Sequence, residues 1–77
     1  MEFQGKEVSI SIHAAQRARF RDIVYPFQIY EVMQTGKLTR FGKHLLKFVK
    51  RGRDGCIICI CEDIGDRIIV KTVERGK

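Results

Sequence analysis

Alternation of polar and β-branched residues marks the first predicted element of the chain. Residues 7–12 place Glu, Ser and Ser between Val, Ile and Ile, which is typical of a strand with one buried face. From His13 the two-residue period stops, and a dense set of alanines and arginines predicts a helix that ends near Val24. The chain therefore begins with a strand followed by a helix.

A second helix is predicted from Pro26 to Thr35. Proline cannot continue the preceding helix, because it lacks a backbone N–H, but it suits the first turn of the next one. Phe27, Tyr30 and Met33 then recur every three residues. Gly36 follows in the position where a helix most often ends in a left-handed residue. Because the two helices are joined tightly, we expect them to form an antiparallel helical hairpin.

The remainder of the chain is predicted to be strand and turn. The expected strands cover residues 37–41, 44–50, 56–62 and 67–74, and turn-forming residues separate them. The resulting order, β-α-α-β-β-β-β, predicts an α+β domain in which the helical hairpin packs on one face of an antiparallel sheet.

The length of 77 residues predicts a single domain, 1–77, close to the lower limit for a chain held by one apolar core. We expect residues 1–6 to be a flexible N-terminus. The sequence has no run of eighteen apolar residues, so we expect no membrane span. The N-terminus has no apolar signal core, and we therefore expect a cytoplasmic protein.

Positive charge is concentrated in one part of the chain. The net charge is +6, and seven of the fifteen Lys and Arg residues lie between residues 37 and 53, where there is no acid. Large apolar residues alternate roughly with these charges, which indicates a folded sheet with a positive face suited to phosphates, nucleic acid or an acidic protein. Both faces of the strand 44–50 are mixed, so the sequence leaves its buried face open. The residues expected to bind nucleic acid are Lys37, Arg40, Lys43, His44, Lys47, Lys50, Arg51, Arg53 and, in the last strand, Lys71.

Three cysteines lie close together, at positions 56, 59 and 61. An odd, clustered set argues against a disulfide framework. Cys56 and Cys59 form a C-x-x-C, but in a strand these two side chains point to opposite faces, and a zinc site needs four ligands. We therefore expect small buried thiols, no metal site and no cofactor.

One histidine and two arginines form a stripe on the first helix. His13, Arg17 and Arg21 are spaced four residues apart, so they share one helical face. An imidazole beside two guanidiniums can serve phosphodiester cleavage, because the reaction needs a proton carrier and cations where negative charge grows. The alternative is that His13 caps the helix and that the arginines bridge to carboxylates such as Asp22 or Glu31.

The last strand supplies a fourth candidate residue for this site. Strict alternation from Ile68 and Val70, which we expect to face the core, places Thr72 and Glu74 on the helix side and Lys71 and Arg75 on the open face. Thr72 would then lie within reach of His13 or a neighbouring arginine. An equally good interpretation is that Thr72 satisfies a buried edge of the sheet.

The first helix carries a recognisable motif. Ser11, His13, Ala14, Arg17, Arg21 and Ile23 match an opening S-x-H-A-x-x-R-x-x-x-R-x-I. In this the chain resembles a small bacterial and archaeal domain-of-unknown-function family that is placed near the RelE/ParE-type toxins. The resemblance covers about residues 9–75 and implies a RelE/ParE-like fold. RelE-like members cleave RNA, whereas ParE-like members bind a DNA topoisomerase. By analogy, the resemblance implies a catalytic set of His13, Arg17, Arg21 and Thr72. The chain departs from RelE-type toxins in having no tyrosine beyond Tyr30.

Two classes of function follow from these observations. The first is a toxin-type, metal-independent ribonuclease or RNA-binding protein, in which the helix stripe holds the phosphate and the basic strands guide the RNA. The second is a non-catalytic interaction module whose basic face docks an acidic protein, such as an antitoxin or a topoisomerase. Free sheet edges would also allow pairing with another copy of the chain.

Overall fold

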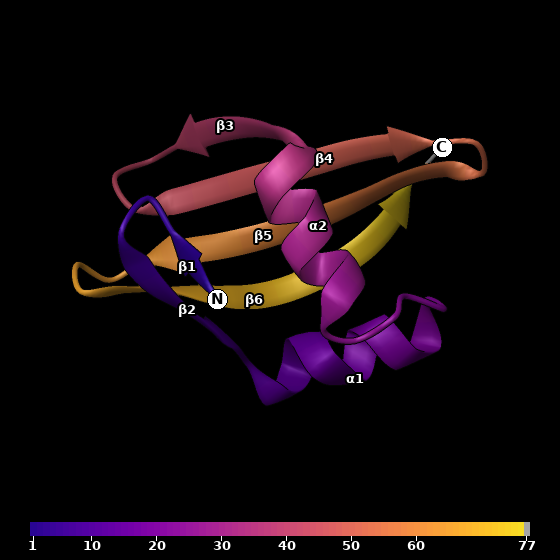
Figure 1. The fold of residues 1–77 in the computed structure, drawn as a ribbon, viewed down its shortest axis with the longest axis horizontal. Coiled ribbons are helices and arrows are strands. Elements are labelled where there is room, and N and C mark those ends of the chain that lie inside the picture. Colours follow the sequence, from indigo (N-terminus) through magenta and orange to yellow (C-terminus); the bar gives the residue numbers. More distant parts are fainter. Residues whose placement is uncertain (77) are drawn as a thin grey trace.

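In the computed structural model, which describes residues 1–76, eight elements make up the chain (Figure 1). They are β1 (Glu2–Phe3), β2 (Lys6–Ile10), α1 (Ile12–Phe20), α2 (Phe27–Thr35), β3 (Lys37–Phe41), β4 (Leu45–Gly52), β5 (Gly55–Asp63) and β6 (Arg67–Gly76). The strands form one six-stranded sheet in the order β1-β2-β6-β5-β4-β3. The predicted α+β class is therefore confirmed, with β1 as an additional strand.

The sheet is mixed rather than purely antiparallel. Strands β3 to β6 form an antiparallel meander, but β2 lies parallel to β6, with Val8 opposite Ile68 and Ile10 opposite Val70. The prediction of an antiparallel sheet was wrong at this one pairing. Parallel neighbours need a long crossover, and the connection that contains both helices supplies it.

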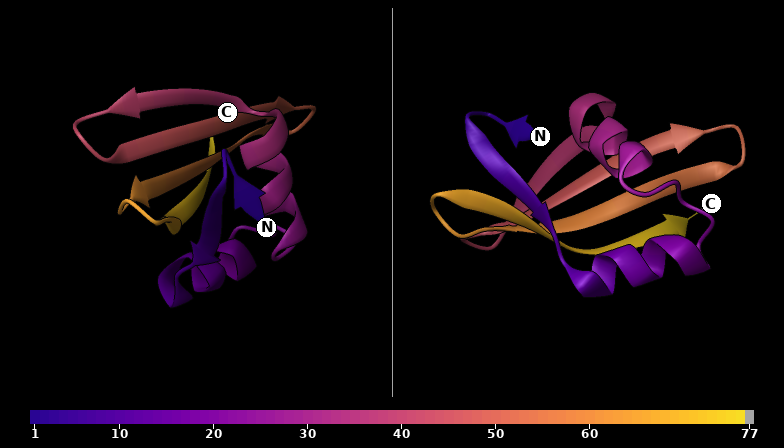
Figure 2. Two further views of the ribbon diagram at one scale, coloured as in Figure 1. Left: turned by 60° about the vertical axis from the view of Figure 1, so that its left-hand side comes forward. Right: turned by 60° about the horizontal axis from the view of Figure 1, so that its bottom comes forward.

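The first residues of the chain fold into the sheet. Residues 1–6, where we expected a flexible N-terminus, contain β1 and the turn that leads into β2. The ring of Phe3 packs edge-on against Phe48 of β4, with centroids 5.0 Å apart. Gln4 accepts a hydrogen bond of 3.2 Å from Arg40 of β3. Because β1 and β3 are the two edges of the sheet, these contacts show that the sheet curls until its ends approach each other (Figure 2).

Helix α1 starts where the sequence motif predicts but ends earlier than expected. The Ser11 hydroxyl caps it by accepting a hydrogen bond from the Ala14 N–H at 3.0 Å. The helix stops at Phe20 instead of Val24. Asp22 adopts a positive φ of 56°, and the Ile23 N–H donates to the Ala18 carbonyl at 2.8 Å, which turns the chain and buries the Ile23 side chain.

The two helices do not form the predicted antiparallel hairpin. Figure 1 shows α1 lying along β6, at the edge that β2 leaves uncovered, whereas α2 crosses in front of β4 and β5. Each helix buries its own residues against the sheet: Ala14 and Ala18 from α1, and Ile29, Val32 and Met33 from α2. The buried turn at Ile23 separates the helices, so contact with the sheet decides their directions.

Gly36 ends α2 for a reason that the sequence pattern did not show. Its φ of −81° is extended rather than left-handed, so the predicted left-handed cap is absent. A Cβ at this position would lie 2.8 Å from the carbonyl oxygen of Val49 and would also collide with the carbonyl of Val32. Glycine is therefore needed because α2 ends in close contact with β4.

A bulge in β6 changes which residues face the core. Ile60 of β5 is opposite Thr72, but the next residue, Cys61, is opposite Val70, so Lys71 is an extra residue in the strand. Val70 and Val73 are consequently both buried. The strict alternation that we assumed for this strand was wrong beyond Val70, and Thr72 lies on the face away from the core.

Phe48 is the largest fully buried side chain, and its loss should be costly. We expect Phe48→Ala to lower the free energy of unfolding by about 3–5 kcal/mol, because it removes apolar contacts and leaves a cavity. Urea denaturation followed by circular dichroism measures this change. Phe27→Ala is the matched control, since Phe27 is 72% exposed and its loss should leave stability nearly unchanged. Equal effects of the two substitutions would contradict the assignment of the core.

Candidate functional site

Three of the four predicted catalytic residues meet at the seam between α1 and β6. Arg17 donates from Nε to Glu74 Oε2 at 3.0 Å and forms a second, shorter contact to the same oxygen through Nη2. Arg21 donates from Nε to Glu74 Oε1 at 3.3 Å. The Thr72 hydroxyl lies 3.4 Å from Glu74 Oε2. Two guanidiniums and a hydroxyl thus converge on one carboxylate. Both arginines are more than fifty positions from Glu74 in the sequence.

The electrostatics of this cluster favour a charged Glu74. The hydrogen bond from Arg17 is the main cause that lowers the pKa of the Glu74 carboxyl, and the charges of Arg17 and Arg21 act in the same direction. From the sequence we named Asp22 and Glu31 as examples of carboxylates that the arginines could bridge to, and Glu74 was not among them. The signal was present, because Glu74 is the one acid in the last strand and lies two residues beyond Thr72 on the same face.

His13 lies apart from this cluster. It is exposed in the first turn of α1, one helical turn before Arg17. Within residues 1–76, no hydrogen bond or ion pair connects His13 to Thr72 or to either arginine. The structure therefore brings together Arg17, Arg21 and Thr72, and leaves the imidazole open to solvent at one end of the stripe.

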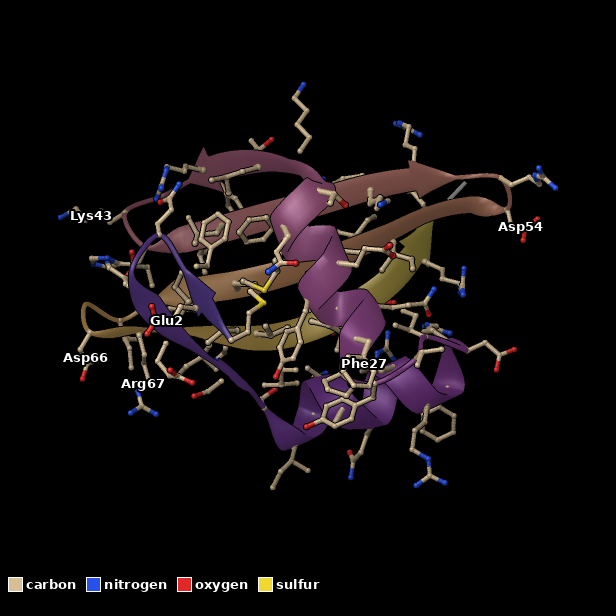
Figure 3. The ribbon with its side chains drawn as sticks, viewed as in Figure 1. Glu2, Phe27, Lys43, Asp54, Asp66 and Arg67 are labelled. Atoms are coloured by element: carbon tan, nitrogen blue, oxygen red, sulfur yellow. The ribbon has the colours of Figure 1, made fainter. Side chains whose placement is uncertain are left out.

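The basic stretch of residues 37–53 is divided among three places. Lys37 and Lys47 share the sheet face that no helix covers, and together with Thr39, Val49 and Arg51 they line a groove of about 340 Å³. Arg40 and Lys50 lie on the other face. Lys43, His44 and Arg53 are exposed in turns, and Figure 3 shows Lys43 at one end of the β4 strand and Asp54 beyond its other end. These cations therefore do not form one continuous track.

Several of these cations already have partners within the chain. Lys50 lies 2.7 Å from the Thr35 hydroxyl and 3.7 Å from a Glu31 carboxylate oxygen, both on α2. Lys71, the bulge residue, lies 3.6 Å from a Glu62 oxygen. Arg75, which we expected on the open face, instead donates to the carbonyls of residues 21 and 22 at the end of α1. Side chains of the last strand thus fix α1 in place.

Exposed aromatic rings surround the connection between the helices, and the sequence analysis did not identify them as functional. Phe20 is 83% exposed, Phe27 72% and Tyr25 50%, and Figure 3 shows Phe27 projecting where α2 begins. Gln16, Arg19 and Phe20 line an open depression of about 560 Å³ on α1. Phe27, Tyr30 and Met33 recur every three residues but do not share one environment, because Phe27 is exposed in the first turn of α2 whereas Met33 is buried. No sequence pattern distinguishes these rings from core residues.

The cysteines behave as buried thiols. Cys59 and Cys61 face the core, whereas Cys56 lies on the other face against Gly76, which confirms that the C-x-x-C pair points in opposite directions. Burial raises the pKa of Cys59 and of Cys61 to about 12. Among the described residues, no group of three or more His, Cys, Asp and Glu is arranged to hold a metal ion. None of the helices in residues 1–76 has the length and hydrophobicity needed to cross a membrane.

The lowered pKa of Glu74 gives a prediction for stability against pH. A carboxyl whose pKa is lower in the folded than in the unfolded state, where it is about 4.3, stabilises the fold above that value, and the contribution is lost as pH falls through the folded pKa. We therefore expect the free energy of unfolding to decrease below about pH 4.3, and Glu74→Gln to reduce this decrease. Urea denaturation of both proteins at several pH values between neutral and acidic measures this decrease in the free energy of unfolding.

Asp63 is the control for this experiment. Its pKa is also lowered, mainly by a hydrogen bond from Lys6, so Asp63→Asn should remove a separate part of the acid sensitivity. The two effects should add, because the carboxylates belong to different ion pairs. If Glu74→Gln left the acid-induced loss of stability unchanged, the ion-pair cluster would not contribute as described.

Comparisons with known proteins found no matching family model, no matching curated protein and no matching solved structure. The function must therefore be argued from the geometry of the chain itself.

Proposed function

We propose that the protein binds single-stranded RNA along α1 and the α1–α2 connection. The observation that carries this proposal is the combination of three exposed aromatic rings, Phe20, Tyr25 and Phe27, with the arginines of α1. Single-stranded nucleic acid is held in this way, because bases stack on aromatic rings while cations follow the backbone. Apolar rings as exposed as Phe20 would otherwise be an unexplained cost for so small a domain.

The Arg17–Arg21 pair supports phosphate recognition. It already holds the two oxygens of the Glu74 carboxylate, so its guanidiniums are oriented to grip an oxyanion. Each guanidinium has five N–H donors and uses only part of them for Glu74. A phosphodiester can therefore bind to the remaining donors, with Glu74 keeping both arginines in position. The net charge of +6 adds a long-range attraction for RNA.

The same residues define the chemistry that we propose for the site. With a phosphodiester on Arg17 and Arg21, the exposed imidazole of His13, one turn away, is the group that can carry a proton. The guanidiniums would stabilise the negative charge that develops on the phosphate, and the Thr72 hydroxyl would turn its one proton from Glu74 toward a phosphate oxygen. This is a metal-independent ribonuclease mechanism, and it requires the RNA to bring His13 and the arginines onto one phosphate.

We further propose the relationship to RelE/ParE-type toxins that the α1 motif suggested. Its support is the helix opening itself: Ser11 caps α1, the buried Ala14 packs on the sheet, and Arg17 and Arg21 meet Thr72 at the last strand. All motif residues except the exposed His13 thus have a structural task that their type explains. The motif supports the fold family, and the activity depends on the site.

RNA binding should depend on the exposed rings. We expect Phe20→Ala combined with Phe27→Ala to weaken binding to a fluorescein-labelled, 12-nucleotide single-stranded RNA by about tenfold or more at low salt, because each lost stacking contact costs about 1–3 kcal/mol. Fluorescence anisotropy measures the affinity. Phe41→Ala is the control, since this ring is also exposed but lies on β3. An affinity that stays unchanged in the double variant would refute this binding surface.

Cleavage should depend on the imidazole. We expect wild-type protein with chelator present to cut end-labelled single-stranded RNA, and His13→Ala to lose cleavage while its RNA affinity changes by less than about threefold, because a single contact is removed. Single-turnover assays on sequencing gels measure the rate. His44→Ala, an exposed histidine in the β3–β4 turn, is the control. Cleavage at the wild-type rate by the His13 variant would exclude this mechanism.

A further inference from the structure

One face of the sheet has no helix or strand over it in the part of the chain that the structure describes. Both views in Figure 2 place α2 and the β1–β2 hairpin on the same side, and β3, β4 and β5 present their other side to solvent. Strand register identifies the residues of this open face. Its cross-strand rows are Lys37–Val49–Ile58–Glu74, Thr39–Lys47–Ile60–Thr72 and Phe41–Leu45–Glu62–Ile69, with Arg51–Cys56–Gly76 as a fourth row beside the first.

The centre of the open face is aliphatic. Ile58 and Ile60 occupy the middle of β5, with Val49 and Ile69 on the neighbouring strands, and all four are only half-buried. Leu45 at the rim is 36% exposed. The solvent face of a one-sided antiparallel sheet is normally polar, because it contributes nothing to the core. An aliphatic centre at this place therefore indicates a surface that another molecule covers.

The charges of the open face are unbalanced. Its two carboxylates are already used: Glu74 binds Arg17 and Arg21, and Glu62 lies beside Lys71. Lys37 and Lys47 make no ion pair with any residue that the structure describes, although they sit on adjacent strands around Val49. Like charges on neighbouring strands repel each other. The β3–β4 half of the face thus has a surplus of positive charge next to the aliphatic centre.

We propose that the open face docks an acidic amphipathic helix of a partner protein. Its apolar side would cover Ile58, Ile60 and Val49, and its carboxylates would meet Lys37 and Lys47. The width of the face agrees with the size of a helix. The distance from β4 to β6 is two strand spacings, or about 10 Å, and a helix with its side chains has about the same diameter. This face meets the proposed RNA site only at its β6 edge, where Thr72 and Glu74 lie, and it contains none of the rings Phe20, Tyr25 and Phe27.

Two other occupants fit the open face less well. A nucleic-acid strand calls for aromatic rings at the centre of the sheet, and here the centre is Ile58 and Ile60. A second copy of the chain would bring another molecule of net charge +6, with the same unpaired lysines, against this face. An acidic helix satisfies the aliphatic centre and the surplus charge together.

The test uses a defined probe, an 18-residue synthetic peptide with Leu at every third or fourth position and Glu elsewhere. Isothermal titration calorimetry measures its affinity for the full chain. We expect binding that weakens as salt rises and that is lost for a peptide of the same composition in scrambled order. Ile58→Thr with Ile60→Thr, and separately Lys37→Glu with Lys47→Glu, should each weaken binding at least tenfold.

Lys43→Glu with Arg53→Glu is the matched control, because it changes the net charge equally but in the turns. It should weaken binding no more than about twofold, and urea denaturation of each variant verifies that the fold is retained. Equal binding of the scrambled peptide, or equal losses in the turn variant, would overturn the proposal in favour of nonspecific attraction.

Two further outcomes would reassign the face. If Ile58→Thr with Ile60→Thr weakened RNA binding as strongly as the loss of Phe20 and Phe27, the face would belong to RNA. If wild-type protein were a dimer in sedimentation equilibrium and this variant a monomer, it would belong to a second copy. The open face is tested by the Ile58 and Ile60 variant and the RNA surface by the Phe20 and Phe27 variant, so either proposal can fail while the other stands.

Discussion

The arrangement of the candidate site depends on the one extra residue in β6. Before Lys71 the strand pairs with β2 and directs Ile68 and Val70 into the core, and after it Val73 takes over that role. Without the bulge, Thr72 and Glu74 would face the core side and could not meet the arginines of α1. β-bulges are common where a side chain must be redirected. This bulge lets β6 pair with β2 before Lys71 and bind the arginines of α1 after it.

The curl of the sheet determines which surfaces remain for function. Phe3 reaches Phe48, Gln4 reaches Arg40, and Lys6 binds Asp63, so the β1–β2 hairpin folds over the same face that α2 covers. One face of the sheet therefore encloses the main core cluster of a very short chain. None of the large side chains in this cluster is available for the other face. The aliphatic residues left on the open face contribute little to that core, which is why they call for a separate explanation.

Sequence reasoning predicted the local structure well and its spatial arrangement less well. The last four strands follow from alternation and from turns rich in glycine, and both helices were located within a few residues. The parallel β2–β6 pair and the separate packing of α1 and α2 were missed, because they depend on contacts between distant parts of the chain. β1 was missed because a strand of two residues has no period.

The candidate site shows the same limit. The four-residue spacing correctly placed Arg17 and Arg21 on one face, but neither Glu74 as their partner nor the solvent position of His13 could be read from that spacing. The basic stretch was expected to form one surface. It was divided because consecutive residues of a strand point to opposite faces, and the sequence did not tell which of the two faces is buried.

The pairing of β2 with β6 has a consequence for how the protein folds during synthesis. Val8 and Ile68 are neighbours in the sheet although sixty positions separate them, and α1 packs mainly on β6. β2 and α1 therefore lack their main neighbour until β6 has been synthesised. Long-range pairing of this kind slows folding. Until this pairing is complete, Arg17 and Arg21 lack Glu74, and the nascent chain exposes a cationic helix whose charge is not neutralised.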